Sequence, residues 1–119
     1  MFFTGHKQLR DVASIDELEE GRSKMSAVAY RRAYHVVTEM QRTQAGAQAL
    51  ENNDYEEFGR LMYQSHESLQ KYFQVSCEEL DQLVELTRSV DGVYGSRMTG
   101  AGFGKDFSFI ISCSIDYSF

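Results

Sequence analysis

Three glycines at alternate positions, Gly100, Gly102 and Gly104, are the residues whose type and spacing most directly suggest chemistry. Glycine weakens helices and strands because it loses more backbone freedom on folding than other residues. Such a cluster therefore indicates a sharp turn or the close approach of another group. Backbone amides in a loop of this kind can hold a phosphate. The alternative is an ordinary glycine-rich turn between two strands, since short glycine motifs often occur without a bound group.

Arginines supply the other candidate contacts for an anion. Arg97 lies three residues before Gly100, which makes it a candidate anionic contact, with a structural salt bridge as the alternative. Arg31 and Arg32 are adjacent and would suit a phosphate, but a charged pair within a helix is more often a solvated face. We therefore expect Arg31 and Arg32 on the solvent side of their helix.

The histidines and cysteines are expected to be structural. His6, His35 and His66 lack the close spacing of metal ligands, so no metal site is predicted, and His35 and His66 are expected at helix packing faces. Cys77 follows a predicted helix cap, where a thiol pKa can fall, but its acidic neighbours oppose that shift. An inert thiol is therefore predicted, and Ser76 is interpreted as the helix cap rather than as a nucleophile.

The composition limits the classes of protein to which the chain can belong. The chain has 119 residues, enough for one small domain, with a net charge of −6 and an isoelectric point near 5.0. An acidic chain without a dense basic patch is a poor candidate for binding nucleic acid or an anionic membrane. Cys77 and Cys113 form neither a disulfide framework nor a zinc spacing, and no signal peptide or membrane span is evident. We expect a cytoplasmic protein.

Four helices and two strands are expected to position these residues. The helices are predicted over about 15–21, 25–50, 54–72 and 77–90, and capping boxes are predicted at Ser14, Asp54 and Ser76. Asn52-Asn53 is expected to end the second helix. The predicted buried positions of the second, third and fourth helices are Tyr30, Ala33, Val37, Met40, Gln44, Ala47 and Leu50; Tyr55, Phe58, Met62, Ser65 and Leu69; and Leu80, Leu83, Val84 and Thr87.

The last quarter of the chain has the alternation of strands. Residues 93–99 are predicted as a short strand that leads into the glycines. From Phe107 to Phe119, apolar residues alternate with polar ones, which predicts a second strand with one buried face. The sequence stops within this pattern, so we expect a C-terminus that has been cut or altered.

Several stretches resemble, in one consistent order, the galactokinase family of the GHMP small-molecule kinases. Residues 95–104 are similar to the third motif of that superfamily. Residues 30–39 with the following Arg42-Thr43, residues 54–69 and residues 75–84 resemble successive galactokinase helices, and 92–100 resembles the approach to the motif. The resemblance runs from about Lys7 to Gly104 and concerns only the C-terminal portion of the family. We therefore divide the chain into a partial GHMP kinase C-terminal domain, 1–104, and a divergent strand-like tail, 105–119.

The resemblance implies an α+β fold, with helices packed on a small antiparallel sheet as in an incomplete ferredoxin-like domain. It implies an enzyme of galactose metabolism that transfers the γ-phosphoryl group of ATP to the C1 hydroxyl of galactose, with ATP and Mg²⁺ as cofactors. No catalytic residue and no Mg²⁺ ligand of the family is matched. The residues that match the loop near the nucleotide phosphates are Thr99, Gly100, Ala101, Gly102, Phe103 and Gly104.

Two departures from the family limit the expected activity. Lys105-Asp106 replaces the Gly-Cys with which the family continues, which puts the geometry of the loop in doubt. The family's catalytic Arg and Asp, its sugar-binding residues and its phosphate-binding loop all belong to an N-terminal half that is not matched. Because phosphoryl transfer depends on groups that position and stabilise the γ-phosphate, we expect the chain alone to be inactive.

Two other functions remain open at this point. The first is a non-catalytic interaction or regulatory module of galactokinase type, which would dock a protein partner on the surface left by the missing half. A large exposed apolar patch would favour it. The second is a fragment of an N-acetylgalactosamine kinase, since the choice of sugar is made in the absent half.

Overall fold

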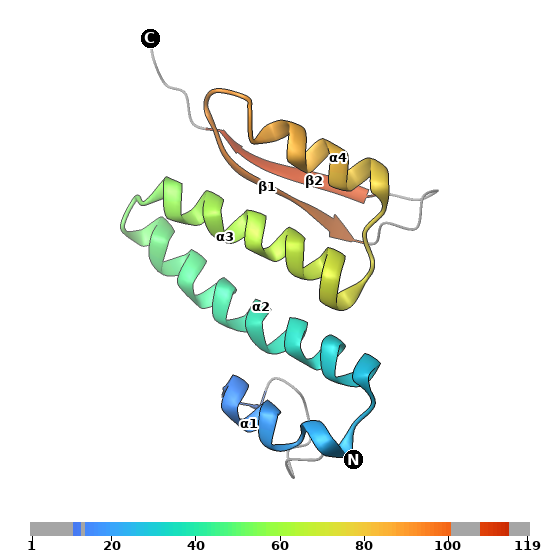
Figure 1. The fold of residues 1–119 in the computed structure, drawn as a ribbon. Helices are drawn as coiled ribbons and strands as arrows, with labels where there is room; N and C mark the ends of the chain where they lie inside the picture. The colour runs from blue at the N-terminus through green and yellow to red at the C-terminus, as the bar shows by residue number, and fades with distance from the viewer. Residues whose placement is uncertain (1–10, 13, 101–107, 115–119) are drawn as a thin grey trace.

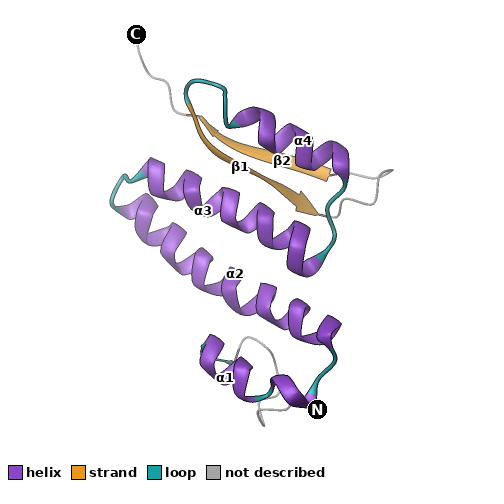
Figure 2. Ribbon diagram, in the orientation of Figure 1, coloured by secondary structure: helices purple, strands orange, loops and turns teal. Residues whose placement is uncertain are grey.

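The chain forms a mostly helical structure with two strands near its C-terminus (Figure 2). The computed structural model describes residues 11, 12, 14–100 and 108–114, and the side chains only up to Gly100. The elements are α1 (Ile15–Glu20), the 3-10 turn η2 (Arg22–Lys24), α2 (Ala27–Glu51), α3 (Tyr55–Ser68), the π-helical turn η3 (Leu69–Phe73), α4 (Glu78–Thr87), β1 (Val93–Gly100) and β2 (Ser108–Ser114).

The elements are stacked in the order α1, α2, α3 and the strand pair (Figure 1). Helices α2 and α3 lie side by side, α1 packs on the side of α2 away from α3, and α4 contacts both strands. Strand β1 pairs antiparallel with β2, with Gly95 opposite Cys113 and Gly100 opposite Ser108. The register shifts between Val93 and Gly95, where β1 enters the pairing.

The N-cap half of two of the three predicted capping boxes is confirmed. Ser14 and Asp54 accept hydrogen bonds from the backbone amides three residues later, at 3.2 and 3.1 Å, and so begin α1 and α3. The third prediction is wrong, because α4 begins after Cys77 without a side-chain cap. Helix α2 ends at Asn52-Asn53 as expected, since Asn53 takes the left-handed conformation with φ 54°.

The predicted stripe of α2 is buried only in its first half. Ala33 and Val37 pack with Val12 and Leu18 in an apolar cluster between α1 and α2, and Tyr30 and Met40 are partly buried against it. The prediction is wrong for Gln44, Ala47 and Leu50, which are exposed, because among the described residues α1 covers only the first half of the helix. Leu83 of α4 is likewise exposed rather than buried.

Helix α3 meets β1 at two glycines. A Cβ atom added to Gly59 would overlap the Tyr94 carbonyl, and one added to Gly95 would overlap the backbone of Gly59. The two backbones therefore touch with no side chain between them, which only glycine allows at both positions. This contact fixes β1, and with it the approach to Gly100, against the middle of α3.

Candidate functional site

The described part of the glycine segment is its start, at the end of β1. Met98 is fully buried, Thr99 is half-buried and Gly100 is exposed. Gly100 has φ 80°, a left-handed conformation that side chains disfavour, so the glycine is required where β1 ends. The other predicted loop residues, Ala101, Gly102, Phe103 and Gly104, lie outside the described residues.

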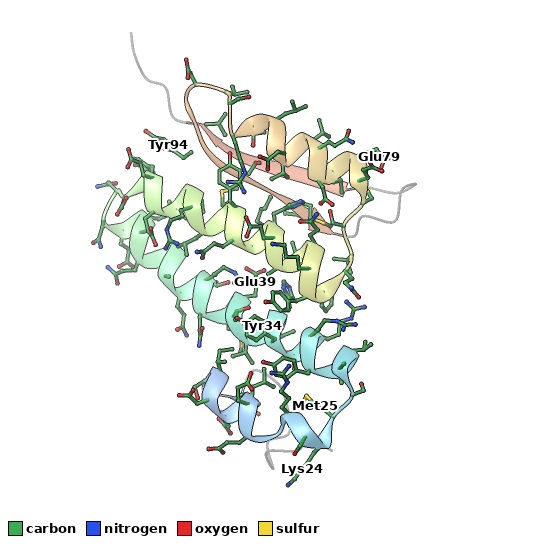
Figure 3. The ribbon with its side chains drawn as sticks, viewed as in Figure 1. Lys24, Met25, Tyr34, Glu39, Glu79 and Tyr94 are labelled. Atoms are coloured by element: carbon green, nitrogen blue, oxygen red, sulfur yellow. The ribbon has the colours of Figure 1, made fainter. Side chains whose placement is uncertain are left out.

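Arg97 is held by a polar network between α2 and α3 rather than left open to solvent. Its Nη1 donates to Ser65 Oγ at 2.7 Å and lies 3.8 Å from Glu39 Oε1. Ser65 Oγ in turn donates to Glu39 Oε2 at 2.8 Å. The Glu39 side chain lies between α2 and α3 (Figure 3). The structure therefore has the salt bridge that was the alternative for Arg97, since its charge faces an internal carboxylate.

Glu39 also pairs with Arg42, so the network contains two cations and one anion. Arg42 Nε donates to Glu39 Oε1 at 3.4 Å, and its Nη2 donates to Thr38 Oγ1 at 3.0 Å. The side chains of Glu39 and Arg42 are both largely buried. Their spacing of three residues along a helix was the available signal for the pair.

His66 connects three elements. It is 3% exposed, as expected for a packing position, and both ring nitrogens have partners. The backbone N–H of Met98 donates to Nδ1 at 3.1 Å, and Nε2 lies 2.8 Å from Asp81 Oδ1. Ser76, predicted as a cap, instead donates from Oγ to the same Asp81 oxygen at 2.6 Å. Helices α3 and α4 and strand β1 thus meet at one imidazole.

His35 is the second buried histidine. Its Nδ1 is 2.8 Å from Ser68 Oγ, and its ring packs 4.9 Å from that of Phe73 between centroids. Burial lowers the pKa of His35; the Glu39 carboxylate opposes this shift, while Arg42 and Arg97 add to it. His35 is therefore a neutral group of the α2–α3 interface. Its burial confirms the prediction that it lies at a helix packing face. His6 lies outside the described residues.

The remaining predicted positions do not gather into a site. Arg32 donates from Nη1 to the Tyr72 carbonyl at 3.1 Å and lies over the Phe73 ring, so the expectation of a solvated side chain is wrong. The Arg31 side chain is half-buried, and its Nε has no hydrogen-bond partner among the residues that the structure describes. Cys77 is a half-buried free thiol at the start of α4.

Two hollows flank these networks. One of about 400 Å³ lies between α2 and α3 and is lined by Arg42, Gly46, Phe58, Met62 and Arg97, among others. A wider one of about 710 Å³ lies between η3 and α4, where Gln70, Lys71, Ser76 and Asp81 contribute to the walls. Each hollow is bordered by one of the two residues, Arg97 and His66, that hold the end of β1.

Neither a metal cluster nor a membrane span is found in the part of the chain that the structure describes. Within residues 11, 12, 14–100 and 108–114, no three His, Cys, Asp or Glu groups are placed to hold a metal ion. The described residues therefore offer no site that fits Mg²⁺. No described helix is both long and apolar enough to cross a membrane.

Comparison with known proteins identifies relatives of this arrangement. Residues 47–105 match the family described as GHMP kinases C terminal. The chain is 59% identical over 100 residues to the galactokinase of Bos taurus and 55% identical to that of Homo sapiens, matches that cover 84% of this chain and 25% of each relative. The predicted resemblance to the C-terminal portion of galactokinases is therefore confirmed.

A solved structure shows the same fold. The crystal structure of Lactococcus lactis galactokinase complexed with galactose is similar with a TM-score of 0.81 and 33% identity, over 92% of this chain and 28% of that one. The mostly helical fold with β1 is therefore that of a GHMP kinase C-terminal segment. The chain spans about a quarter of the length of the relatives it matches.

Proposed function

We propose that this chain acts as the C-terminal part of a galactokinase-type sugar kinase, since residues 47–105 match the GHMP kinases C terminal family and the chain is similar to galactokinases over most of its length. The observation that carries this proposal is the 59% identity over 100 residues, together with a TM-score of 0.81 over 92% of the chain. The reaction proposed for the whole protein is transfer of the ATP γ-phosphoryl group to the C1 hydroxyl of galactose.

The segment Thr99–Gly104, which we call the glycine segment, is the proposed contribution of this chain to that reaction. Amides of such a segment suit the phosphate region of ATP because they donate hydrogen bonds without bringing a side chain between backbone and ligand. Two features support this role: Gly100 adopts a conformation that glycine tolerates, and Arg97 and Met98 are tied to α2 and α3 just before it. Arg97 is proposed to position the segment, and any contact with an anion would be in competition with Glu39.

The transfer chemistry itself is proposed to need the rest of a galactokinase. Phosphoryl transfer is accelerated by positioning and by electrostatic stabilisation of the γ-phosphate, usually with Mg²⁺. Within the described residues no three His, Cys, Asp or Glu groups are placed to hold a metal ion, and the chain spans about a quarter of the length of its relatives. Mg²⁺ would neutralise charge on ATP in the whole enzyme, and this chain's residues would only support the bound nucleotide.

The finer form of the fold is part of the same proposal. In the whole protein, β1 and β2 would belong to a larger, ferredoxin-like antiparallel sheet, with α4 against one of its faces. The direct pairing of β1 with β2 supports this arrangement. The division of the chain at Gly104 is likewise proposed, and it agrees with the family match that ends at residue 105. The location proposed for the protein is the cytoplasm.

A non-catalytic interaction module is the second candidate function. Large apolar side chains are exposed along α4 and just after it, with Leu83 at 49%, Leu86 at 63% and Val90 at 53% exposure. Leu83 and Leu86, three residues apart, lie on one side of the helix, and Val90 follows in the turn after it. Exposed apolar side chains grouped in this way are more favourable against a protein partner than in water. This function would use the same fold without ATP turnover.

The test compares the isolated chain with a chimera. In the chimera, residues 7–104 of this chain replace the matching residues of the Bos taurus galactokinase. Galactose-dependent ADP release from Mg-ATP is expected from the chimera and not from the isolated chain. The double change Gly100→Val and Gly102→Val should abolish release, whereas Gly46→Ala, near the C-terminal end of α2, should not.

Each possible result contradicts a different part of the proposal. A folded chimera without turnover would overturn the proposal and favour the interaction module. Turnover by the isolated chain, lost in the double variant, would overturn the claim that the remainder of the kinase carries the essential groups. Turnover in the chimera that survives the double change would exclude the glycine segment from the site.

A further inference from the structure

The Met98 amide is bound by a side chain of α3, immediately before the glycine segment. Met98 pairs with Ile110 of β2, but its N–H donates to His66 Nδ1 at 3.1 Å and so points toward α3. A buried backbone amide without a partner is costly. His66 therefore takes the place that a neighbouring strand would occupy on this side of β1.

The two contacts of His66 fix its protonation. A backbone N–H can only donate, so Nδ1 must be the acceptor and carry no proton. The ring proton is then on Nε2, which donates to Asp81 Oδ1 at 2.8 Å. A neutral imidazole with its proton on Nε2 satisfies both contacts, whereas a protonated one would lose the acceptor for Met98.

The Asp81 carboxylate is itself held in place. Ser76 Oγ donates to Oδ1 at 2.6 Å, and Gln70 Nε2 donates to Oδ2 at 3.0 Å. With its far end anchored in this way, the His66 ring has little freedom to rotate, and it is 3% exposed. The position of the Met98 amide therefore depends on α4 and on the segment before it, and not only on β2.

We propose that His66 is a positioning residue for the end of β1, at Thr99 and Gly100. By holding the Met98 amide through Nδ1 while Asp81 holds Nε2, it sets where β1 ends and how Thr99 and Gly100 are presented to the phosphates of ATP. This inference rests on the proposed function, in which the glycine segment supports the nucleotide. The role is separate from the chemistry, since among the described residues the ring nitrogens of His66 contact Met98 and Asp81.

A matched pair of substitutions separates the two contacts. In His66→Asn the side-chain carbonyl lies near the former Nδ1 and keeps an acceptor for Met98. In His66→Gln the longer amide reaches toward Asp81 but leaves no acceptor for Met98. The expected result in the chimera is a rise of about tenfold in KM for ATP with His66→Gln and less than about threefold with His66→Asn, the size expected from loss of one buried hydrogen bond.

A stability control excludes a general effect. Leu61→Ala truncates a buried side chain of the same helix and should lower the denaturation midpoint at least as much as His66→Gln without raising KM for ATP. Equal KM values in the two His66 variants, or an equal rise in Leu61→Ala, would overturn the proposal.

Hydrogen exchange of the 119-residue chain gives a readout that does not need activity. Relative to the amide of Val37 in α2, the Met98 and Thr99 amides should exchange faster in His66→Gln and at the parent rate in His66→Asn. If the parent chimera shows no turnover, the proposed function fails, and the exchange data alone decide whether His66 holds β1. Exchange that is unchanged in His66→Gln would overturn the positioning role.

Discussion

The two sides of α2 are held by different kinds of contact. Toward α1, the helix packs through apolar side chains, with Leu18 and Val12 against Ala33 and Val37. Toward α3, it packs through polar groups such as Glu39 (Figure 3) and His35, and α3 in turn meets β1 through bare glycine backbone. Apolar packing tolerates changes that keep volume, whereas a hydrogen-bond network or a backbone contact depends on each partner. The elements that position the glycine segment belong to the less tolerant side.

The largest effect is expected where α3 and β1 touch. Gly59→Ala should destabilise the protein by more than about 4 kcal/mol, because the added methyl group overlaps the Tyr94 carbonyl and only separation of helix from strand relieves it. Urea unfolding followed by far-ultraviolet circular dichroism measures the change.

The control is the same substitution in α2. Gly46→Ala places its methyl group 3.4 Å from the Phe58 ring and should be neutral or stabilising by up to about 1 kcal/mol through helix propensity. Equal effects of the two changes would contradict the backbone contact.

Next in size is the apolar side of α2. Leu18→Ala removes a fully buried side chain and should cost about 3 kcal/mol from lost burial and the cavity that remains. Leu86→Ala, at a position that is 63% exposed, should change stability by less than about 0.5 kcal/mol. The same urea titrations apply. A small effect at Leu18 would mean that α1 does not stay docked on α2.

The apolar side was more predictable from the sequence than the polar side. Hydrophobic periodicity found Ala33 and Val37, and capping chemistry found the starts of α1 and α3. Periodicity failed at Ala47 and Leu50, because a stripe shows which residues could be buried and not how far a neighbouring helix reaches. It also gave no sign of the π-helical turn after Ser68, which the sequence treated as continuous helix.

The sequence predicted a candidate site at the glycines, which stays a prediction, but it did not predict the residues that hold the end of β1. The glycines were singled out because their spacing is unusual, and Arg97 because it precedes them. The partners of Arg97 and Met98, Ser65 and His66, lie 32 residues earlier in the chain, so no local pattern joins them. Gly59 and Gly95 are also far apart in the sequence. An isolated glycine within a helix weakens the helix prediction, and its role is not evident until the opposing backbone is known.

A smaller effect is expected from the charge at the centre of the polar side. Glu39→Gln should cost about 1 kcal/mol, because Arg42 and Arg97 lose their carboxylate in a partly solvated site. Glu85→Gln removes an exposed carboxylate of α4 that pairs with Arg88, and it should leave the urea midpoint unchanged. A Glu39→Gln protein as stable as its parent would show that hydrogen bonding to Ser65, rather than charge, joins α2 to α3.

The smallest and most selective effect is the pH dependence of His35. Burial lowers the pKa of His35 in the folded chain, so below its usual value of about 6.5 the unfolded chain binds more protons. Stability from this residue is therefore complete above about pH 6.5 and declines as the pH falls toward the folded pKa. Urea midpoints at pH 7.5, 6.5 and 5.5 measure the decline, and His35→Gln should flatten it.

The same titration links His35 to the charge that faces it. Glu39 raises the pKa of His35, whereas Arg42 and Arg97 lower it. With Glu39→Gln, the folded pKa should fall further, and the loss of stability should extend to lower pH than in the parent. A parent and a Glu39→Gln variant with the same pH profile would contradict this coupling, even if Glu39→Gln lowers stability at pH 7.5. The polar side of α2 would then consist of separate contacts rather than one network.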